Sequence, residues 1–278
     1  MFDKQSAKHR NSISDGQLAI VKLLYKYRFG SSELLRISLG LNEGPGVYKK
    51  LKILCDDGYV ARRYDKSYKI QGMPAAYYLL AKGYRELQRY SEFRAIDDKL
   101  IKYSYKDKTV GKPFVGRNLN VYRATVELQR LYPDIKIFTK RELIGRKHFP
   151  PELPDLFVSL KADGDDKPHR FFLDFIPANT PRPAIDKRIA DYNKFFDEGG
   201  WDSTGSALPT MLLLCELGAD EKRVQRWVRH KQNALDSDEP AYYTSTLPAL
   251  KIATSDSLEI WSSIDEPDEL LSLLSIPS

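Results

Sequence analysis

The chain has 278 residues, of which 42% are hydrophobic and 29% are charged, a composition typical of a folded globular protein. Its length allows one large domain or two ordinary ones, and we expect two. The longest apolar run, MLLLCEL, is too short to span a bilayer, and the N-terminal residues lack the apolar core of a signal peptide. We therefore expect a cytoplasmic protein with no membrane partner. The two isolated cysteines argue against a disulfide framework or a structural zinc site.

The net charge of +6 is unevenly distributed along the chain. Residues 1–110 contain 22 Lys and Arg against 12 Asp and Glu, whereas the remainder contains 22 against 26. This polarity suits a polyanionic partner that is engaged by the N-terminal part. On charge alone, a merely basic solvated surface explains the excess equally well.

Three short helices are predicted in the N-terminal part. The first begins at Ser14 and Gln17, which have the spacing of a capping box, and continues with an apolar stripe. The stripe consists of Leu18, Val21, Leu24 and Tyr25. The second helix lies in SSELLRISLG and the third in VYKKLKILCDD, which directs apolar residues inward and lysines outward. Three short helices with tight turns and a basic third helix describe a helix-turn-helix.

The next segment completes a DNA-binding pattern. YVARRYDKSYKIQGMPAAYYLL predicts two strands joined by a polar turn, and a further helix begins near Ala81. This is the element order of a winged helix, so we expect residues 12–90 to bind double-stranded DNA through the third helix and the hairpin. The candidate DNA-binding residues are Tyr48, Lys49, Lys50, Lys52, Arg62, Arg63, Lys66 and Lys69. Surface lysines usually form only a solvated face, but these fall on the two elements that the fold uses for DNA.

Clean periodicity ends after Leu87, so we expect a linker at 91–112 and a second domain at 113–278. The second domain reads as helix, three strands, helix, strand, helix and strand, ending in a short amphipathic helix within SSIDEPDELLSLLSIPS. Pro183 marks the start of its second helix and Gly199 the end. The order predicts an α+β or α/β domain in which a mixed sheet carries helices on both faces.

Two aspartates stand out on adjacent predicted strands. Asp155 precedes the strand DLFVSL, and Asp174 lies within RFFLDFI, whose apolarity on both faces marks a central strand. A buried carboxylate without a partner is costly, so Asp174 requires one. The partner is either an arginine or hydrogen-bond donor from a neighbouring helix, or a divalent cation held by oxygen ligands from both strands.

The two aspartates, 19 residues apart on a hairpin that follows a helix and a strand, resemble the core of PD-(D/E)xK nucleases. Together with LLYKYRFGSSELLRISLG, PAAYYLLAKG, ADYNKFFDEGGW and PTMLLLCEL, they make residues from about 18 to 245 resemble the replication-relaxation family, which includes MobC-type relaxases of mobilisable plasmids. The resemblance implies a nuclease-like domain that cuts or holds DNA at an origin, and a winged helix that directs the protein to that site. It also implies Mg²⁺ or Mn²⁺ as cofactor, with Asp155 and Asp174 as catalytic ligands.

The nuclease motif has a lysine or an acid two residues after the second carboxylate, where this chain has Ile176. Lys187 or Arg188, on the following helix, is the candidate substitute that contacts the scissile phosphate. Helical geometry places Lys187 opposite the apolar stripe of that helix and Arg188 at the edge of the stripe. An arginine stabilises a phosphate but does not act as a general base near neutral pH.

Two further residues are candidates for the same chemistry. Glu127 on the preceding helix is a possible third metal ligand. Tyr192 is a possible nucleophile, although its position on the apolar stripe favours a core role.

Three interpretations remain, and they leave open whether the chain is an enzyme. In the first, it is a DNA-binding protein of a plasmid or mobile element that nicks DNA at an origin with a divalent metal. In the second, it is a non-catalytic replication or transcription regulator, whose nuclease-like domain forms a homodimer or recruits replication or conjugation proteins. In the third, it is a transcription repressor with a ligand-sensing domain.

Overall fold

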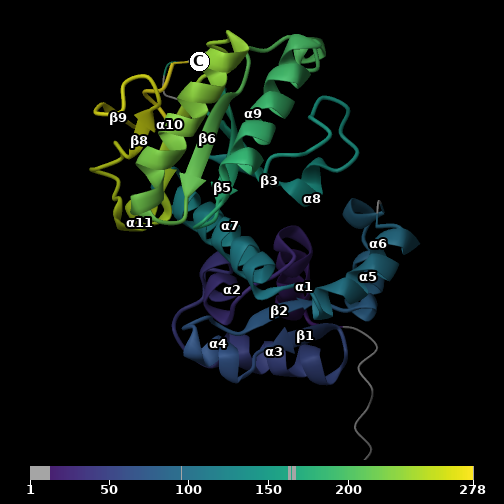
Figure 1. Cartoon of the computed structure of the whole chain (residues 1–278). Helices are drawn as coiled ribbons and strands as arrows, with labels where there is room; N and C mark the ends of the chain where they lie inside the picture. The colour runs from purple at the N-terminus through teal and green to yellow at the C-terminus, as the bar shows by residue number, and fades with distance from the viewer. Residues whose placement is uncertain (1–12, 95, 162–163, 165–166, 278) are drawn as a thin grey trace, which may run out of the picture. The chain divides into compact units, whose positions relative to one another are not determined.

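The computed structural model of the chain describes residues 13–94, 96–161, 164 and 167–277 (Figure 1). Residue 12, where we expect the winged helix to begin, and most of the turn at 162–166 lie outside the described residues. The chain divides into two compact units, Met1–Val115 and Gly116–Ser278. Each unit combines helices with strands, so the described chain is a mixed α+β structure.

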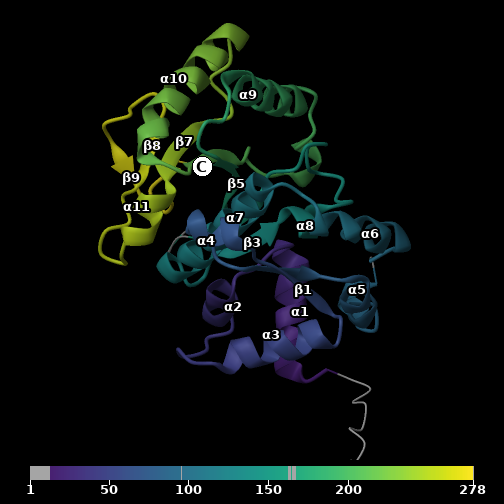
Figure 2. The same cartoon turned by 60° about the horizontal axis from the view of Figure 1, so that its bottom comes forward.

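The first unit consists of helices and a small antiparallel sheet (Figure 2). Its elements are α1 (Asp15–Tyr27), α2 (Ser32–Ser38), α3 (Gly46–Asp56), β1 (Val60–Arg63), α4 (Lys66–Ile70), β2 (Ala76–Leu79), α5 (Ala81–Leu87), η1 (Ser91–Phe93), α6 (Asp98–Tyr103) and η2 (Ser104–Lys108). Helix α7 (Lys112–Leu131) begins in this unit and continues in the second.

The first helix begins where the capping box predicts. The Gln17 side-chain oxygen accepts a hydrogen bond from the Ser14 backbone N at 2.9 Å, which confirms the box. The stripe that α1 buries is rotated from the predicted one, since Ile20 and Tyr27 are buried whereas Leu18 and Tyr25 are only half-buried. In α3 the predicted inward residues are all buried. They are Val47, Leu51 and Leu54.

The hairpin differs from its prediction in one respect. Strands β1 and β2 pair antiparallel, and Gly30, between α1 and α2, exchanges backbone hydrogen bonds of 3.0 and 2.8 Å with Tyr77 on the other edge of β2. The polar turn that we expected between the strands holds helix α4. Its formation follows from Asp65, whose carboxylate accepts from the backbone N–H groups of Ser67 and Tyr68, and from the burial of Tyr68 beneath it.

Residues 91–112, the expected linker, contain η1, α6 and η2. They belong to the first unit, which extends to Val115. Asp107 anchors this segment. Its buried carboxylate pairs with Arg28 at 2.7 Å, and its backbone oxygen accepts from Arg63 at 3.1 Å. Buried polar groups require such partners, so α6 and η2 are fixed against the helical core.

The second unit is built on a seven-stranded sheet, counted over the described residues. After α7 its elements are β3 (Lys136–Thr139), α8 (Lys140–Leu143), β4 (Leu156–Leu160), β5 (His169–Ile176), α9 (Arg182–Asp197), η3 (Asp202–Thr204), β6 (Thr210–Cys215), α10 (Gly218–Leu235), β7 (Tyr242–Thr246), α11 (Leu247–Ile252), β8 (Trp261–Ser263) and β9 (Leu270–Leu271). Helix α9 has Pro183 in its first turn, and Gly199, just beyond its end, has φ 72°, as predicted.

The strands lie in sequence order, β3 to β9. Strands β3, β4 and β5 are antiparallel, β5, β6 and β7 are parallel, and the last two strands return to antiparallel pairing. One face packs against α7 and α11, and the other against α9 and α10, which lie in front of the sheet in Figure 1. Strand β5 is buried on both faces, as its sequence predicts.

The prediction of an amphipathic helix at the C-terminal end is wrong. The tail forms β8 and β9, in which Trp261 pairs with Leu271, and Leu273 and Ile276 enter the core on the α7 face of the sheet. Pairing with β7 satisfies the backbone, and this contact depends on residues distant in sequence. No helix in the described part of the chain has the length and apolarity needed to cross a membrane.

Candidate functional site

Asp155 and Asp174 meet at the junction of β4 and β5. Asp155 lies immediately before β4, and its backbone N–H donates to Asp174 Oδ1 at 3.3 Å. Each residue is only 5% exposed. The antiparallel pairing of the two strands therefore brings together two carboxylates that the sequence separates by 19 residues.

The carboxylate of Asp155 is held by Arg117 from α7. Arg117 Nη1 and Nη2 donate to the two carboxylate oxygens at 2.7 and 2.6 Å, a parallel, bidentate pair. The backbone N–H of Phe175 donates to Asp155 Oδ2 at 2.9 Å. Both oxygens of Asp155 are thus engaged by donors of the chain itself.

The carboxylate of Asp174 is held by Arg188 from α9. Arg188 Nε and Nη2 donate to its two oxygens at 2.7 and 2.9 Å, and Tyr192 donates through its hydroxyl at 2.9 Å. Arg188 also donates to the backbone oxygens of Glu152 and Leu153, at 2.6 and 3.0 Å. The guanidinium therefore joins the sheet to the loop that precedes Asp155.

Burial is the largest influence on the pKa of both aspartates, and it acts against the charged form. At Asp174 the charge of Arg188 and the hydrogen bonds from Arg188 and Tyr192 outweigh burial, so its pKa lies below the ordinary value. At Asp155 burial and the neighbouring charge of Asp174 outweigh the attraction of Arg117, so its pKa is raised. Burial also raises the pKa of Tyr192 well above its ordinary value, which keeps the phenol protonated.

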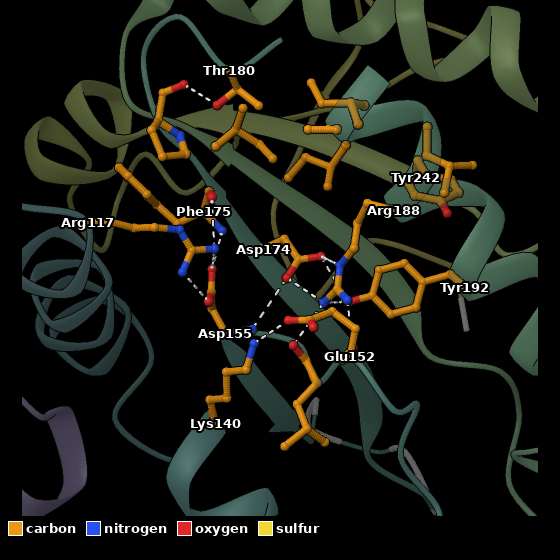
Figure 3. A pocket seen from close by; sticks show the side chains of 17 residues that line it. Arg117, Lys140, Glu152, Asp155, Asp174, Phe175, Thr180, Arg188, Tyr192 and Tyr242 are labelled. Atoms are coloured by element: carbon orange, nitrogen blue, oxygen red, sulfur yellow. Dashed lines mark hydrogen bonds and ion pairs between the residues drawn. The ribbon is translucent and has the colours of Figure 1, made fainter. Parts of the chain in front are cut away.

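Asp155, Asp174, Arg117 and Arg188 line a cavity of about 310 Å³ (Figure 3). In Figure 3, Arg117 and Arg188 reach their aspartates from opposite sides. Lys140 and Glu152, which pair with each other at 2.5 Å, also line the cavity, and Ile185 belongs to its apolar wall. The cavity therefore presents three cations and three carboxylates, which balance one another.

These residues do not fit a divalent metal. Mg²⁺ and Mn²⁺ bind free carboxylate oxygens, and here arginines and backbone N–H groups occupy the oxygens of Asp155 and Asp174. Among the described residues, no group of three or more His, Cys, Asp or Glu side chains is placed to hold a metal ion. Each aspartate instead has an internal arginine partner, the alternative to a cation that the sequence left open for Asp174.

The remaining expected catalytic residues have other contacts. Lys187, whose side chain is 74% exposed, pairs with Asp191 one turn along α9. Glu127, the expected third ligand, pairs with Arg130 on its own helix at 2.8 Å and is not part of the cavity. Tyr192 packs against Phe172 in the core and its hydroxyl donates a hydrogen bond to Asp174, which is a structural arrangement for a phenol.

Sequence reasoning missed Arg117, Lys140 and Glu152. Arg117 left a usable signal, because it precedes Val121 by four residues and therefore continues the stripe that α7 turns towards the sheet. An arginine on an apolar stripe indicates a buried acid partner. Lys140 begins the four-residue helix α8 and Glu152 lies in the loop after it, so neither lies in an element long enough for periodicity to indicate which way its side chain points.

The first unit offers a second candidate site, on the exposed face of α3. Tyr48 is 59% exposed and its hydroxyl accepts from Ser32 at 3.0 Å, while Lys49 and Lys52 are exposed on the same helix. Lys50 differs from the prediction, because it is half-buried and its side chain lies against Gly16 of α1. Ile53, 48% exposed and four residues after Lys49, joins the outward face and was not predicted.

The candidate residues of β1 and α4 also divide into exposed and half-buried side chains. Arg62, Lys66 and Lys69 are exposed, and the Arg62 guanidinium stacks on the ring of Tyr64 at 4.8 Å. Arg63 is half-buried and donates to the backbone of Asp107, so it holds η2 in place instead of facing solvent.

No protein-family model matches the chain, and the search of curated proteins found no match. Two solved structures have a distant likeness to it, those of the restriction endonuclease FokI alone and bound to DNA. Their TM-scores are 0.31 and 0.30, with 12% and 11% sequence identity over 85% of this chain. The chain spans only 43% of the length of either FokI structure. A likeness at this level does not establish a shared fold, and the resemblance to the replication-relaxation family remains without a matching family model.

Proposed function

We propose that this chain is a double-stranded DNA-binding protein that places α3 in the major groove. We also propose that its second unit does not cleave DNA but binds another protein, either a second copy of the chain or a different partner. The first unit has the order of a winged helix: α1, a bridging residue at Gly30, α2, α3, and the hairpin of β1 and β2. In that fold the third helix enters the major groove and the hairpin meets the phosphate backbone.

The observation that carries the proposal is the outward face of α3. Lys49 and Lys52 are exposed there beside Tyr48, on a helix whose opposite face is fixed by the core. Lysines supply the phosphate contacts that dominate affinity for DNA, and Tyr48 and Ile53 offer groups that can reach base edges. The hairpin adds Arg62, and α4 adds Lys66 and Lys69.

Duplex binding is tested by fluorescence anisotropy over a series of salt concentrations. The family resemblance makes a fragment of a plasmid or mobile-element origin the first duplex to try. We expect Lys49→Glu combined with Lys52→Glu to weaken binding and to reduce the slope of log K against log salt by about 2, or roughly 0.9 for each phosphate that a lysine no longer neutralises. Lys194→Glu, at an exposed lysine on α9, is the control for the charge change of one such substitution. Equal slopes for the wild type and the α3 variant would contradict the proposal.

The meeting of Asp155 and Asp174 favours a second candidate function, metal-dependent nicking at an origin. The bidentate arginines weigh against it, because both carboxylates already have full sets of donors. We therefore expect a supercoiled plasmid that carries the origin to stay intact with the protein and Mg²⁺ or Mn²⁺. Nicking that depends on metal and disappears in Asp174→Ala would establish the nuclease.

Without cleavage, the second unit is left to make a homodimer or to recruit replication or conjugation proteins. Sedimentation equilibrium of the full chain, with and without the duplex, separates a dimer from a monomer that awaits a partner. A monomer at all concentrations, alone and on DNA, would exclude the dimer.

A further inference from the structure

The first unit carries a basic groove that lies outside the expected DNA-binding elements. The groove, of about 800 Å³, is lined by α5 and by the α6 and η2 segment, and it begins at Gly58, just beyond the end of α3. Helices α5 and α6 lie beside each other in both views, apart from α2 (Figures 1 and 2). Lys82, Arg85 and Lys102 line it and are exposed, against one acid, Asp98.

Exposed aromatic rings accompany these cations. Tyr105 lines the groove and is 66% exposed, and Tyr103, nearby on the same segment, is 51% exposed with Lys106 at 4.7 Å from its ring centre. A tyrosine ring left in water loses the free energy that burial would give it, so two such rings in one short segment indicate a partner with flat faces.

The segment that carries the rings is held rigidly. Ser104 and Asp107, which lie among the exposed residues, are buried, and the Asp107 carboxylate pairs with Arg28 at 2.7 Å. The inward residues fix the backbone, so Tyr103, Tyr105 and Lys106 project from a supported surface. A preformed surface loses little conformational entropy when it binds.

We propose that this groove binds single-stranded nucleic acid, with phosphates on Lys82, Arg85 and Lys102 and a base stacked on Tyr105. Cations that follow a groove and aromatic rings on which bases stack are the two components of single-strand recognition. A duplex presents phosphates but keeps its base faces stacked, so it uses the lysines and leaves the rings exposed. The rings are therefore what favours a single strand as the occupant.

The test uses the full-length chain and anisotropy with labelled 20-nucleotide oligo-dT and oligo-U, which separate DNA from RNA. We expect Tyr105→Ala to weaken binding by about tenfold or more, as for the loss of one stacked base. Tyr105→Phe should bind like the wild type, because stacking needs the ring and not the hydroxyl. Lys102→Glu should lower the slope of log K against log salt by about 0.7, the value for one phosphate of a single strand.

Control variants separate this proposal from the duplex-binding one. Lys194→Glu changes the same charge on α9 and should leave single-strand binding unchanged. Lys49→Glu with Lys52→Glu should lower duplex binding and spare oligo-dT binding, and Tyr105→Ala should do the reverse. A single 5-iodouracil placed along the oligonucleotide should crosslink to Tyr105 on irradiation.

Three results would overturn the proposal. The first is no binding of either oligonucleotide by the wild type at about 50 mM salt, where phosphate contacts are strong. The second is wild-type affinity in both Tyr105→Ala and Lys102→Glu. The third is an equal loss of duplex and single-strand binding in Tyr105→Ala, which would make the groove part of the duplex surface.

Discussion

The guanidinium of Arg188 holds Asp174, Tyr192 and two backbone oxygens at the same time. Its side chain is 17% exposed, so water can replace little of this network. A buried ion pair adds little net stability compared with a well-packed apolar pair, but removing one member leaves an uncompensated charge. Single substitutions of Asp174 or Arg188 should therefore lower the stability of the fold.

We expect Arg188→Ala to lower the free energy of unfolding by about 3–5 kcal/mol, because it leaves Asp174 buried without its cation. Lys187→Ala, at the neighbouring exposed position, should change it by no more than about 0.5 kcal/mol. Urea unfolding followed by circular dichroism measures both. Similar values for the two variants would mean that the pair is not formed in the folded protein.

The pH dependence of stability follows from the depressed pKa of Asp174. A carboxyl group whose pKa is lower in the folded state contributes stability above its unfolded pKa, about 3.9, and loses it as the pH falls through the folded pKa. The difference in unfolding free energy between the wild type and Asp174→Asn should be largest near neutral pH and should shrink below about pH 4.

The control for this pH series is Asp191→Asn, since Asp191 pairs with Lys187 at the surface. A surface pair contributes little, so its difference from the wild type should be small at every pH. If the difference in unfolding free energy between the wild type and Asp174→Asn increased as the pH fell, its sign would contradict the lowered pKa of Asp174.

At the scale of single elements, helix α5 depends on a close contact with the residue before β1. A Cβ added to Gly83 would lie 2.6 Å from the backbone oxygen of Tyr59, and that oxygen is fixed by a hydrogen bond from Leu80 N. Gly83→Ala should therefore lower the melting temperature, although alanine favours a helix by about 1 kcal/mol over glycine. Gly46→Ala, with open space around its Cβ at the start of α3, should not lower it.

Element boundaries with local signals were predictable from the sequence. The capping box at Ser14, Pro183 at the start of α9 and Gly199 after its end each act within one helical turn, and all three are present. Helix α4 was missed although Asp65 caps it, because five residues give too short a pattern for periodicity to indicate a helix.

Contacts between distant residues set the limit of prediction from the sequence. The tail was predicted as a helix because its apolar residues have helical spacing, but pairing with β7 makes it extended. The need for a partner at Asp174 was foreseen, but Arg188, at the edge of its helix stripe, was named as a contact to the scissile phosphate and not as that partner. The identity of the partner of Asp155 was not, since Arg117 lies 38 residues away.

At the scale of the whole molecule, the two units have separate hydrophobic cores. The core of the first unit lies between α1, α2, α3 and the hairpin, and that of the second lies on the two faces of the seven-stranded sheet. The basic excess also falls in the first unit. Compact units can open by separate local unfolding reactions, so a substitution in one unit should leave the other protected.

Hydrogen exchange resolved by peptide tests this separation. Gly83→Ala should speed exchange of amides in α1, α3 and β2 and leave those of β5 and β6 unchanged, since the steric conflict at Tyr59 O lies in the first unit. Arg188→Ala should speed exchange in β4, β5 and α9 and spare the first unit. If either variant speeds exchange throughout the described chain, the two units unfold as one cooperative body and stability in one is coupled to the other.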